Sequence, residues 1–232
     1  MVEGTLSQPR EHARVPRNHL PQLIHPGPWS AEEGADSAPQ GQAAYTSLTT
    51  FSGWRKVHGQ IVDAISIRER PAEVEDRAIP GHWEGDLLAG SKNSHIATLV
   101  ERHSRFTMLI KVPSKDTATV VAALSKHVLK LPATLRRSLT WDRGHEMARH
   151  KSFTVDTQVK VYFCDPQSPW QRGTNENTNG LLRQYFPRKT DLSGYSQADL
   201  NKVALRLNQR PRQTFGFQTP ASKLRDSVAP TG

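Results

Sequence analysis

The sequence predicts an α/β fold built on a sheet of mixed strand direction, and three observations lead to it. Three short β-rich segments follow one another between residues 82 and 112. From residue 116 onward, segments of helical and strand periodicity alternate, as in sheets whose strands are joined by crossover helices. Three acidic residues lie within the first predicted strand, at the end of the fourth and on the helix after the fifth, and they can converge at the sheet edge where open α/β sheets tend to bind ligands.

The three β-rich segments predict a meander of antiparallel strands. HWEGDLLAG, residues 82–90, reads as a strand that stops at a glycine. HIATLVER (95–102) and RFTMLIKV (105–112) are also β-rich, and only a short polar turn separates them. Strands that follow each other so closely pair most simply as antiparallel neighbours.

The rest of the chain alternates between helix and strand. Apolar residues at helical spacing predict a helix over 116–131, with Asp116 as its N-cap. The elements expected after it are a strand over 135–142, a helix over 145–157, a strand over 159–165, a helix within 168–186 and a last helix over 197–211. The complete order is β-β-β-α-β-α-β-α with a helical tail, which predicts flanking helices around one mixed sheet.

The composition divides the chain into three parts. Residues 1–54 are expected to form a disordered or atypical N-terminal extension, because they are rich in proline and lack periodicity. Residues 55–80 form a lead-in segment punctuated by prolines, and residues 81–228 are expected to form the functional core.

The charge and the cysteine content narrow the function classes. A net charge of +9 predicts a polyanionic partner, for which nucleic acid is the usual candidate. Cys164 is the only cysteine, which excludes a disulfide framework or a cysteine-based zinc site within one chain. The sequence has neither an apolar run of about 20 residues nor the apolar core of a signal peptide, so a cytoplasmic location is expected.

Asp86, Asp142 and Glu176 are the candidate metal ligands. Mg²⁺ prefers oxygen ligands, and two such ions can activate a nucleophile and stabilise the leaving oxygen in phosphoryl chemistry. Taken singly, Asp142 reads as a turn residue and Glu176 as a solvent-exposed helical residue. A metal site is therefore indicated only by the three acids together, because the predicted sheet can bring all three to one edge.

Four stretches of sequence carry a resemblance to a known family. They are ERPAEVEDRAIPGHWEGDLL, LTWDRGHEM, VYFCDPQSPWQRGTNENTNGLLRQYFP and LNQRPRQTFGFQTPASKL. Asp86 and Asp142 are separated by 55 residues, and Asp142 and Glu176 by 33. In these features residues 65–224 resemble the IS30 family of insertion-sequence transposases, within the DDE integrase and transposase superfamily.

The resemblance implies an RNase H-like fold and a metal-dependent transposase. Such an enzyme uses two Mg²⁺ or Mn²⁺ ions to cleave a strand at the element's end, and the freed 3′ hydroxyl then attacks target DNA. Asp86 would bridge both ions, while Asp142 and Glu176 would each hold one. The implied partners are double-stranded DNA and further copies of the chain in a homo-oligomer.

Several residues near the acids are expected to contact DNA. Arg183 lies seven residues after Glu176, on the same helical face, and matches the basic residue of the family signature. The other candidates, on either side of the acids, are Arg143, Gln171, Arg172 and Asn175.

Three neighbours of the acids are open to two interpretations. Trp170 either shapes the DNA path or anchors the start of its helix in the core. Glu84 shares the strand face of Asp86 and is either a fourth ligand or, as we favour, a supporting residue. Gly85 is expected to keep the backbone clear of ligands.

The N-terminal part differs from the family pattern. IS30-type transposases usually carry N-terminal helix-turn-helix regions, which residues 1–50 do not resemble. The main hypothesis is an active transposase core. The alternatives are a truncated, non-catalytic remnant that binds DNA or regulates a full-length transposase, and a structure-selective nuclease of the same fold.

Overall fold

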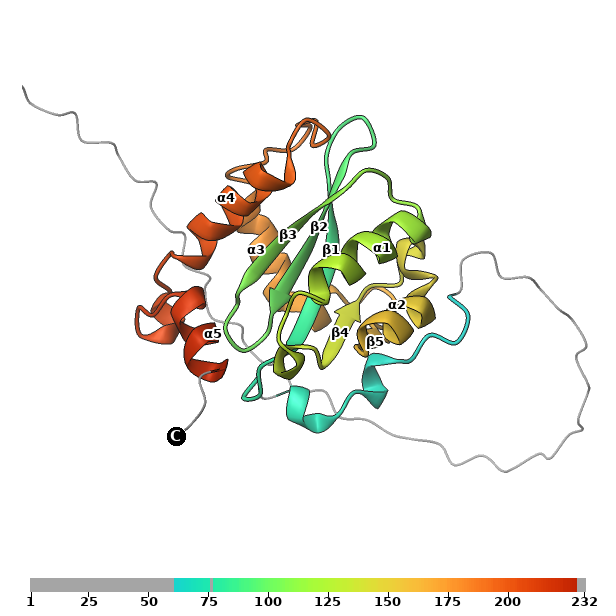
Figure 1. Cartoon of the computed structure of the whole chain (residues 1–232), viewed down its shortest axis with the longest axis horizontal. Coiled ribbons are helices and arrows are strands. Elements are labelled where there is room, and N and C mark those ends of the chain that lie inside the picture. The colour runs from blue at the N-terminus through green and yellow to red at the C-terminus, as the bar shows by residue number, and fades with distance from the viewer. Residues whose placement is uncertain (1–60, 76, 229–232) are drawn as a thin grey trace, which may run out of the picture. The chain divides into compact units, whose positions relative to one another are not determined.

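A five-stranded sheet in the order β3-β2-β1-β4-β5 forms the centre of the fold (Figure 1). The computed structural model describes residues 61–75 and 77–228. The strands are β1 (His82–Ala89), β2 (His95–Glu101), β3 (Thr107–Val112), β4 (Ser138–Trp141) and β5 (Lys160–Phe163). β1 pairs antiparallel with β2, as β2 does with β3, whereas β4 runs parallel to both β1 and β5. This confirms the predicted mixed sheet.

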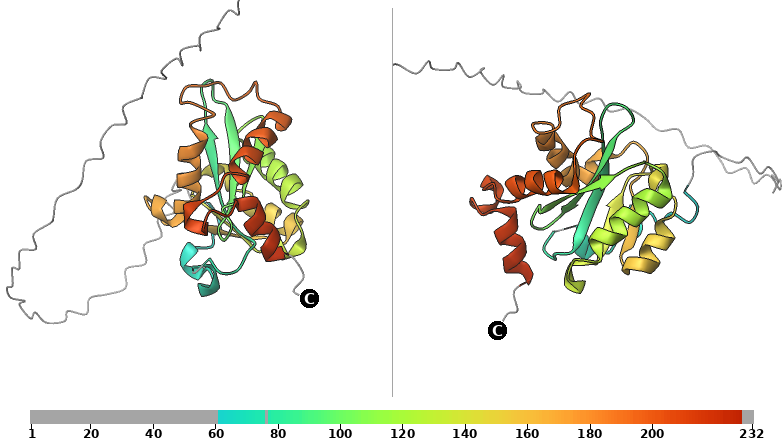
Figure 2. Two further views of the ribbon diagram at one scale, coloured as in Figure 1. Left: turned by 90° about the vertical axis from the view of Figure 1, so that its left-hand side faces the viewer. Right: turned by 45° about the horizontal axis from the view of Figure 1, so that its top comes forward.

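Helices cover both faces of the sheet (Figure 2). They are α1 (Thr117–Val128), α2 (His150–Thr157), α3 (Gly173–Leu182), α4 (Gln197–Asn208) and α5 (Pro220–Val228). Short 3-10 turns occur at Ile67–Glu69, Ala72–Val74, Ala133–Leu135, His145–Met147, Pro169–Arg172 and Gln213–Phe215.

The alternation of side chains along each strand produces two apolar cores. In β2, Ala97 and Leu99 face the core that α1 and α2 cover, whereas Ile96 faces the core that α3 and α4 cover. β3 divides in the same way between Ile110 and Leu109. Successive side chains of a strand point to opposite faces, so a sheet buried on both sides needs apolar residues at consecutive positions.

The predicted helices and strands exist, but several of their bounds were wrong. The strand expected over 135–142 begins only at Ser138, because Arg136 adopts a non-strand backbone with φ −112° and ψ 67°. The helix expected over 145–157 begins at His150, since Arg149 has φ −92° and ψ 29°, which lie outside the α-helical region. The predicted N-cap is confirmed, because the Asp116 side chain accepts the backbone N–H of Thr119 at 2.9 Å. Helix α5 was not predicted.

The predicted N-terminal extension, residues 1–54, lies outside the described residues. The described part of the lead-in, 61–75 and 77–80, contains two 3-10 turns, and Ser66 forms a β-bridge with Phe163 at the end of β5. The lead-in is thereby attached to the outer parallel strand. Across the part of the chain that the structure describes, no helix is long and apolar enough to cross a membrane.

The buried imidazole of His82 predicts a pH-dependent stability. Its Nδ1 lies 2.7 Å from Ser138 Oγ, and burial, followed by nearby arginines, lowers its pKa from 6.5 to about 4. Between these values the unfolded chain binds a proton that the folded protein does not. The free energy of unfolding should therefore fall as the pH drops from 6.5 to 4, by at most about 1.4 kcal/mol per pH unit.

Urea unfolding at a series of pH values measures this slope. His82→Gln should flatten it, whereas the control His145→Gln, at an exposed position, should leave it unchanged. An equal slope in wild type and His82→Gln would assign the pH dependence to other groups.

Candidate active site

Asp86 and Asp142 come from two parallel strands and lie level with the carboxyl end of the shorter strand, β4. In the pairing of β1 with β4, Glu84 is level with Thr140. Two further residues along each strand lead to Asp86 within β1 and to Asp142, directly after the end of β4. The strand register thus brings together two acids that the sequence separates by 55 residues.

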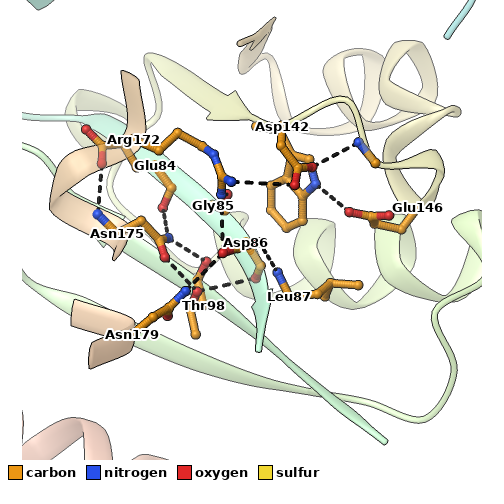
Figure 3. Close-up of polar contacts among 12 residues, drawn as sticks. Glu84, Gly85, Asp86, Leu87, Thr98, Asp142, Glu146, Arg172, Asn175 and Asn179 are labelled. Atoms are coloured by element: carbon orange, nitrogen blue, oxygen red, sulfur yellow. Dashed lines mark hydrogen bonds and ion pairs between the residues drawn. The ribbon is translucent and has the colours of Figure 1, made fainter. Parts of the chain in front are cut away.

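A single guanidinium group links the two aspartates. Arg172 Nη1 lies 3.3 Å from Asp86 Oδ2, and Arg172 Nη2 lies 3.5 Å from Asp142 Oδ2 (Figure 3). Nη1 also donates a hydrogen bond to the carbonyl oxygen of Gly85 at 3.0 Å. The Arg172 side chain is only 8% exposed. The aspartates therefore already share one buried cation.

Further hydrogen bonds fix the orientation of both carboxylates. Asp86 accepts the backbone N–H of Leu87 at 2.8 Å through Oδ1 and the side-chain amide of Asn179 at 2.9 Å through Oδ2. Asp142 Oδ1 accepts the backbone N–H of Gly144 at 2.9 Å. Burial raises the pKa of Asp86, and the nearby charge of Asp142 adds to this, while Arg172 acts in the opposite direction.

One face of the segment from Arg172 through α3 lies along β1. Arg172, Asn179 and Arg183 occur at helical spacing on this face, and Arg183 Nη1 donates to the Ala89 carbonyl oxygen at 3.1 Å. Glu176 lies on the same face, between the two residues that hold Asp86. Its side chain is exposed. The backbone of Glu176 therefore lies between the two residues that contact Asp86, while its carboxylate points to solvent.

The donor chemistry of this site fits a divalent cation. Asp86 and Asp142 supply oxygen ligands, and the guanidinium between them shows that the position stabilises positive charge. Among the described residues, no three His, Cys, Asp or Glu side chains are grouped closely enough to hold a metal ion. The reason is local: Arg172 lies between the aspartates, and Glu176 faces solvent.

A buried polar layer lies directly beneath the acids. Glu84 is fully buried and pairs with Arg102. Asn175 donates its backbone N–H to Glu84 Oε2 at 2.9 Å and its side-chain amide to the Glu84 carbonyl oxygen at 2.8 Å. Thr98 donates to Asn175 Oδ1 at 3.1 Å. These bonds agree with the supporting role expected for Glu84. The complete burial of Asn175 does not fit the DNA contact expected from the sequence.

The other residues expected to contact DNA lie in different environments. Arg143 is exposed beside Asp142, and its Nε donates to the Cys164 carbonyl oxygen at 3.0 Å. Gln171 bonds to Asp165 through both amide atoms. Arg172 is buried against the aspartates, which does not fit a direct DNA contact in this arrangement. Arg143 and the half-buried Arg183 remain accessible.

Two interpretations of neighbouring residues were wrong. Trp170 is 72% exposed, so it does not anchor the helix in the core. Gly85 faces a protein neighbour, because a Cβ at this position would lie 2.2 Å from the ring of the buried Trp141. The glycine is needed for the ring to pack against β1.

Two residues that contact Asp86 or its neighbours were not predicted from the sequence. Asn179 holds the Asp86 carboxylate, and Thr98 is the residue opposite Asp86 on β2. Helical spacing from Glu176 was a signal for Asn179, since residues three apart are neighbours on a helix. No local signal identified Thr98, because its position depends on strand register.

The contact between Gly85 and Trp141 predicts a destabilised variant. Gly85→Ala should lower the free energy of unfolding by about 1–3 kcal/mol through overpacking. The matched control is Gly180→Ala within α3, where an added Cβ meets nothing within 4 Å. This control should raise stability by about 0.5–1 kcal/mol, as expected for alanine in a helix. Urea denaturation measures both, and a stable Gly85→Ala protein would contradict the packing argument.

Comparison with known proteins agrees with this geometry. Residues 76–169 match the family model described as the integrase core domain. Over 171 residues, the chain is 58% identical to the transposase InsI for insertion sequence element IS30A of Escherichia coli, covering 74% of this chain and 45% of that protein. It is 53% identical over 172 residues to the transposase for insertion sequence element IS1086 of Cupriavidus metallidurans, with coverages of 74% and 51%.

The mixed sheet with its acids at the carboxyl edge is thus an RNase H-like integrase core. Within that class the chain belongs to the IS30 family of insertion-sequence transposases. It spans about half the length of these curated relatives, or slightly less.

Proposed function

We propose that this chain contains the catalytic core of a DNA transposase that cleaves a strand at an element end and joins the freed 3′ hydroxyl to target DNA. Asp86, Asp142 and Glu176 are the proposed ligands of two Mg²⁺ or Mn²⁺ ions. The observation that carries the proposal is the pair of aspartates around one shared cation, with Glu176 on the adjoining helical face.

The residues have distinct proposed roles. Asp86, whose two oxygens accept hydrogen bonds from Leu87 and Asn179, is already oriented by the fold and would help to hold both ions. Asp142 and Glu176, whose side chains are more exposed, would each help to hold one of the two ions. Paired divalent ions supply nucleophile activation and leaving-group stabilisation when bound. Arg172 would withdraw from the aspartates, and the Glu176 side chain would turn towards them, as the site fills.

The DNA contacts proposed here follow from accessibility. Arg183 lies half-buried along the face of α3 that carries Glu176, and Arg143 is exposed beside Asp142. Both cations can approach phosphates on either side of the carboxylates, where such contacts position a duplex without reading its sequence. Since two element ends must be brought together, we expect a homo-oligomer on DNA, acting in the cytoplasm.

The carboxylates predict a metal-dependent activity. The full chain should nick labelled DNA and transfer strands with Mn²⁺ or Mg²⁺ and should do neither in EDTA. Asp86→Asn, Asp142→Asn and Glu176→Gln should each lower the rate by at least about 100-fold, as is typical when a group that acts on the transition state is removed.

Asp165→Asn is the matched control, since this acid lies near the site but pairs with Arg68 instead. It should keep most of the activity. Nicking that survives in all three carboxylate variants would refute the assignment. DNA binding without metal-dependent products in the wild type would instead favour a non-catalytic regulator.

The shared cation predicts a link between Arg172 and metal binding. Arg172→Met leaves two carboxylates unneutralised and should lower the free energy of unfolding in EDTA by about 1–3 kcal/mol, less than for a fully buried pair. Mn²⁺ should then raise the thermal midpoint of this variant more than that of the wild type, because no guanidinium has to be displaced. Arg143→Met is the exposed control. Equal Mn²⁺ shifts in Arg172→Met and the wild type would contradict this exchange.

A further inference from the structure

A pocket rich in arginine lies beside the 3-10 turn Pro169–Arg172. Its volume is about 350 Å³, which falls within the range of about 300–1,000 Å³ common for small-ligand sites. The residues that define it are Arg68, Arg70, Arg77, Arg102, Glu75 and Trp170. A pocket with four guanidinium groups and one carboxylate is suited to an anion.

Among the described residues, the carboxylates around this pocket do not pair with all of its arginines. Arg70 pairs with Glu75 at the rim, and Arg102 pairs with the buried Glu84 behind it. Arg68 is highly exposed, and its Nε lies 3.2 Å from Asp165 Oδ2. Arg77 is exposed, and no carboxylate of the described residues pairs with it.

Two of the arginines also carry buried donors that lack partners. The side chains of Arg70 and Arg102 are only 3% and 4% exposed. The Nε atoms of both have no hydrogen-bond partner among the described residues. Burial lowers the pKa of Arg102, and the like charges of Arg70 and Arg77 lower it further, against the influence of Glu84. These two guanidinium groups are thus poorly hydrated, and a negative charge nearby would stabilise them.

An exposed aromatic ring completes the pocket. Trp170 is 72% exposed and lines the pocket together with Gln171. Arg172, two residues after Trp170, reaches both candidate aspartates. Since consecutive Cα atoms lie about 3.8 Å apart, the Cα atoms of Trp170 and Arg172 are at most about 7.6 Å apart. A ligand stacked on Trp170 would therefore lie close enough to belong to the same DNA strand as a phosphate at the carboxylates.

We propose that this pocket binds an unpaired nucleotide of single-stranded DNA, with its phosphate on the arginines and its base stacked on Trp170. Guanidinium groups match phosphate oxygens in geometry and charge. Indole rings stack on any base, provided that the base is not already stacked within a duplex. The role in transposition, holding a frayed nucleotide next to the cleaved phosphate, rests on the proposed function; the binding site itself does not.

Fluorescence anisotropy of the full chain with labelled dT12 in EDTA tests the pocket without any catalysis. Trp170→Ala and Arg77→Ala alter exposed side chains and should each weaken binding about fivefold or more, the lower end of the effect of removing one stacking contact. A 12-nucleotide abasic strand separates the two contributions. With this probe Arg77→Ala should still weaken binding, whereas Trp170→Ala should have no effect.

The matched controls are Phe217→Ala, which removes another exposed aromatic ring, and Arg206→Ala, which removes an exposed cation on α4. Both should bind dT12 as the wild type does. Wild-type affinity in Trp170→Ala and Arg77→Ala would overturn the proposal. So would an equal loss in the controls, or binding of a 12-base-pair duplex but not of dT12. The binding experiments contain EDTA, so their outcome does not depend on catalysis. A chain that binds dT12 through this pocket but shows no nicking with Mn²⁺ or Mg²⁺ would count against the proposed function alone.

Discussion

The shared guanidinium of Arg172 is the interaction on which the candidate active site depends. Parallel pairing of β1 with β4 forces Asp86 and Asp142 together, and two half-buried carboxylates repel each other unless a cation lies nearby. Arg172 supplies that cation from the residue just before α3. The same contact therefore neutralises the two aspartates and positions α3, the helix that carries Glu176.

The polar layer beneath this contact explains how the helix holds its position. Glu84, buried between Arg102 and the start of α3, accepts the backbone N–H of Asn175. A buried ion pair need not add net stability, because desolvation opposes its Coulombic attraction. Its geometric effect is clear here, since it ties β1 to the helix start on one side and to the arginine pocket on the other. The two candidate DNA-binding regions thus share a common wall.

The elements of the fold could be predicted from periodicity, while their bounds could not. β-rich segments such as HIATLVER and a capped helix at Asp116 carry local signals, which the structure confirms. Strand ends such as Ser138 depend on which backbone groups find a partner across the sheet, and periodicity does not contain that information. Helix α5 was missed for a related reason, since few of its residues are buried.

The sequence by itself determined the fold class and the family and singled out the three candidate acids, because spacing and local motifs are properties of the chain alone. Only the tertiary structure decided which residues serve those acids. Arg172 and Asn175 read as DNA contacts in the sequence, yet long-range packing buries one between the aspartates and the other against Glu84. Trp170, which could equally have been a core residue, is left at the surface. Burial and partnership arise from segments far apart in the chain, so local sequence cannot specify them.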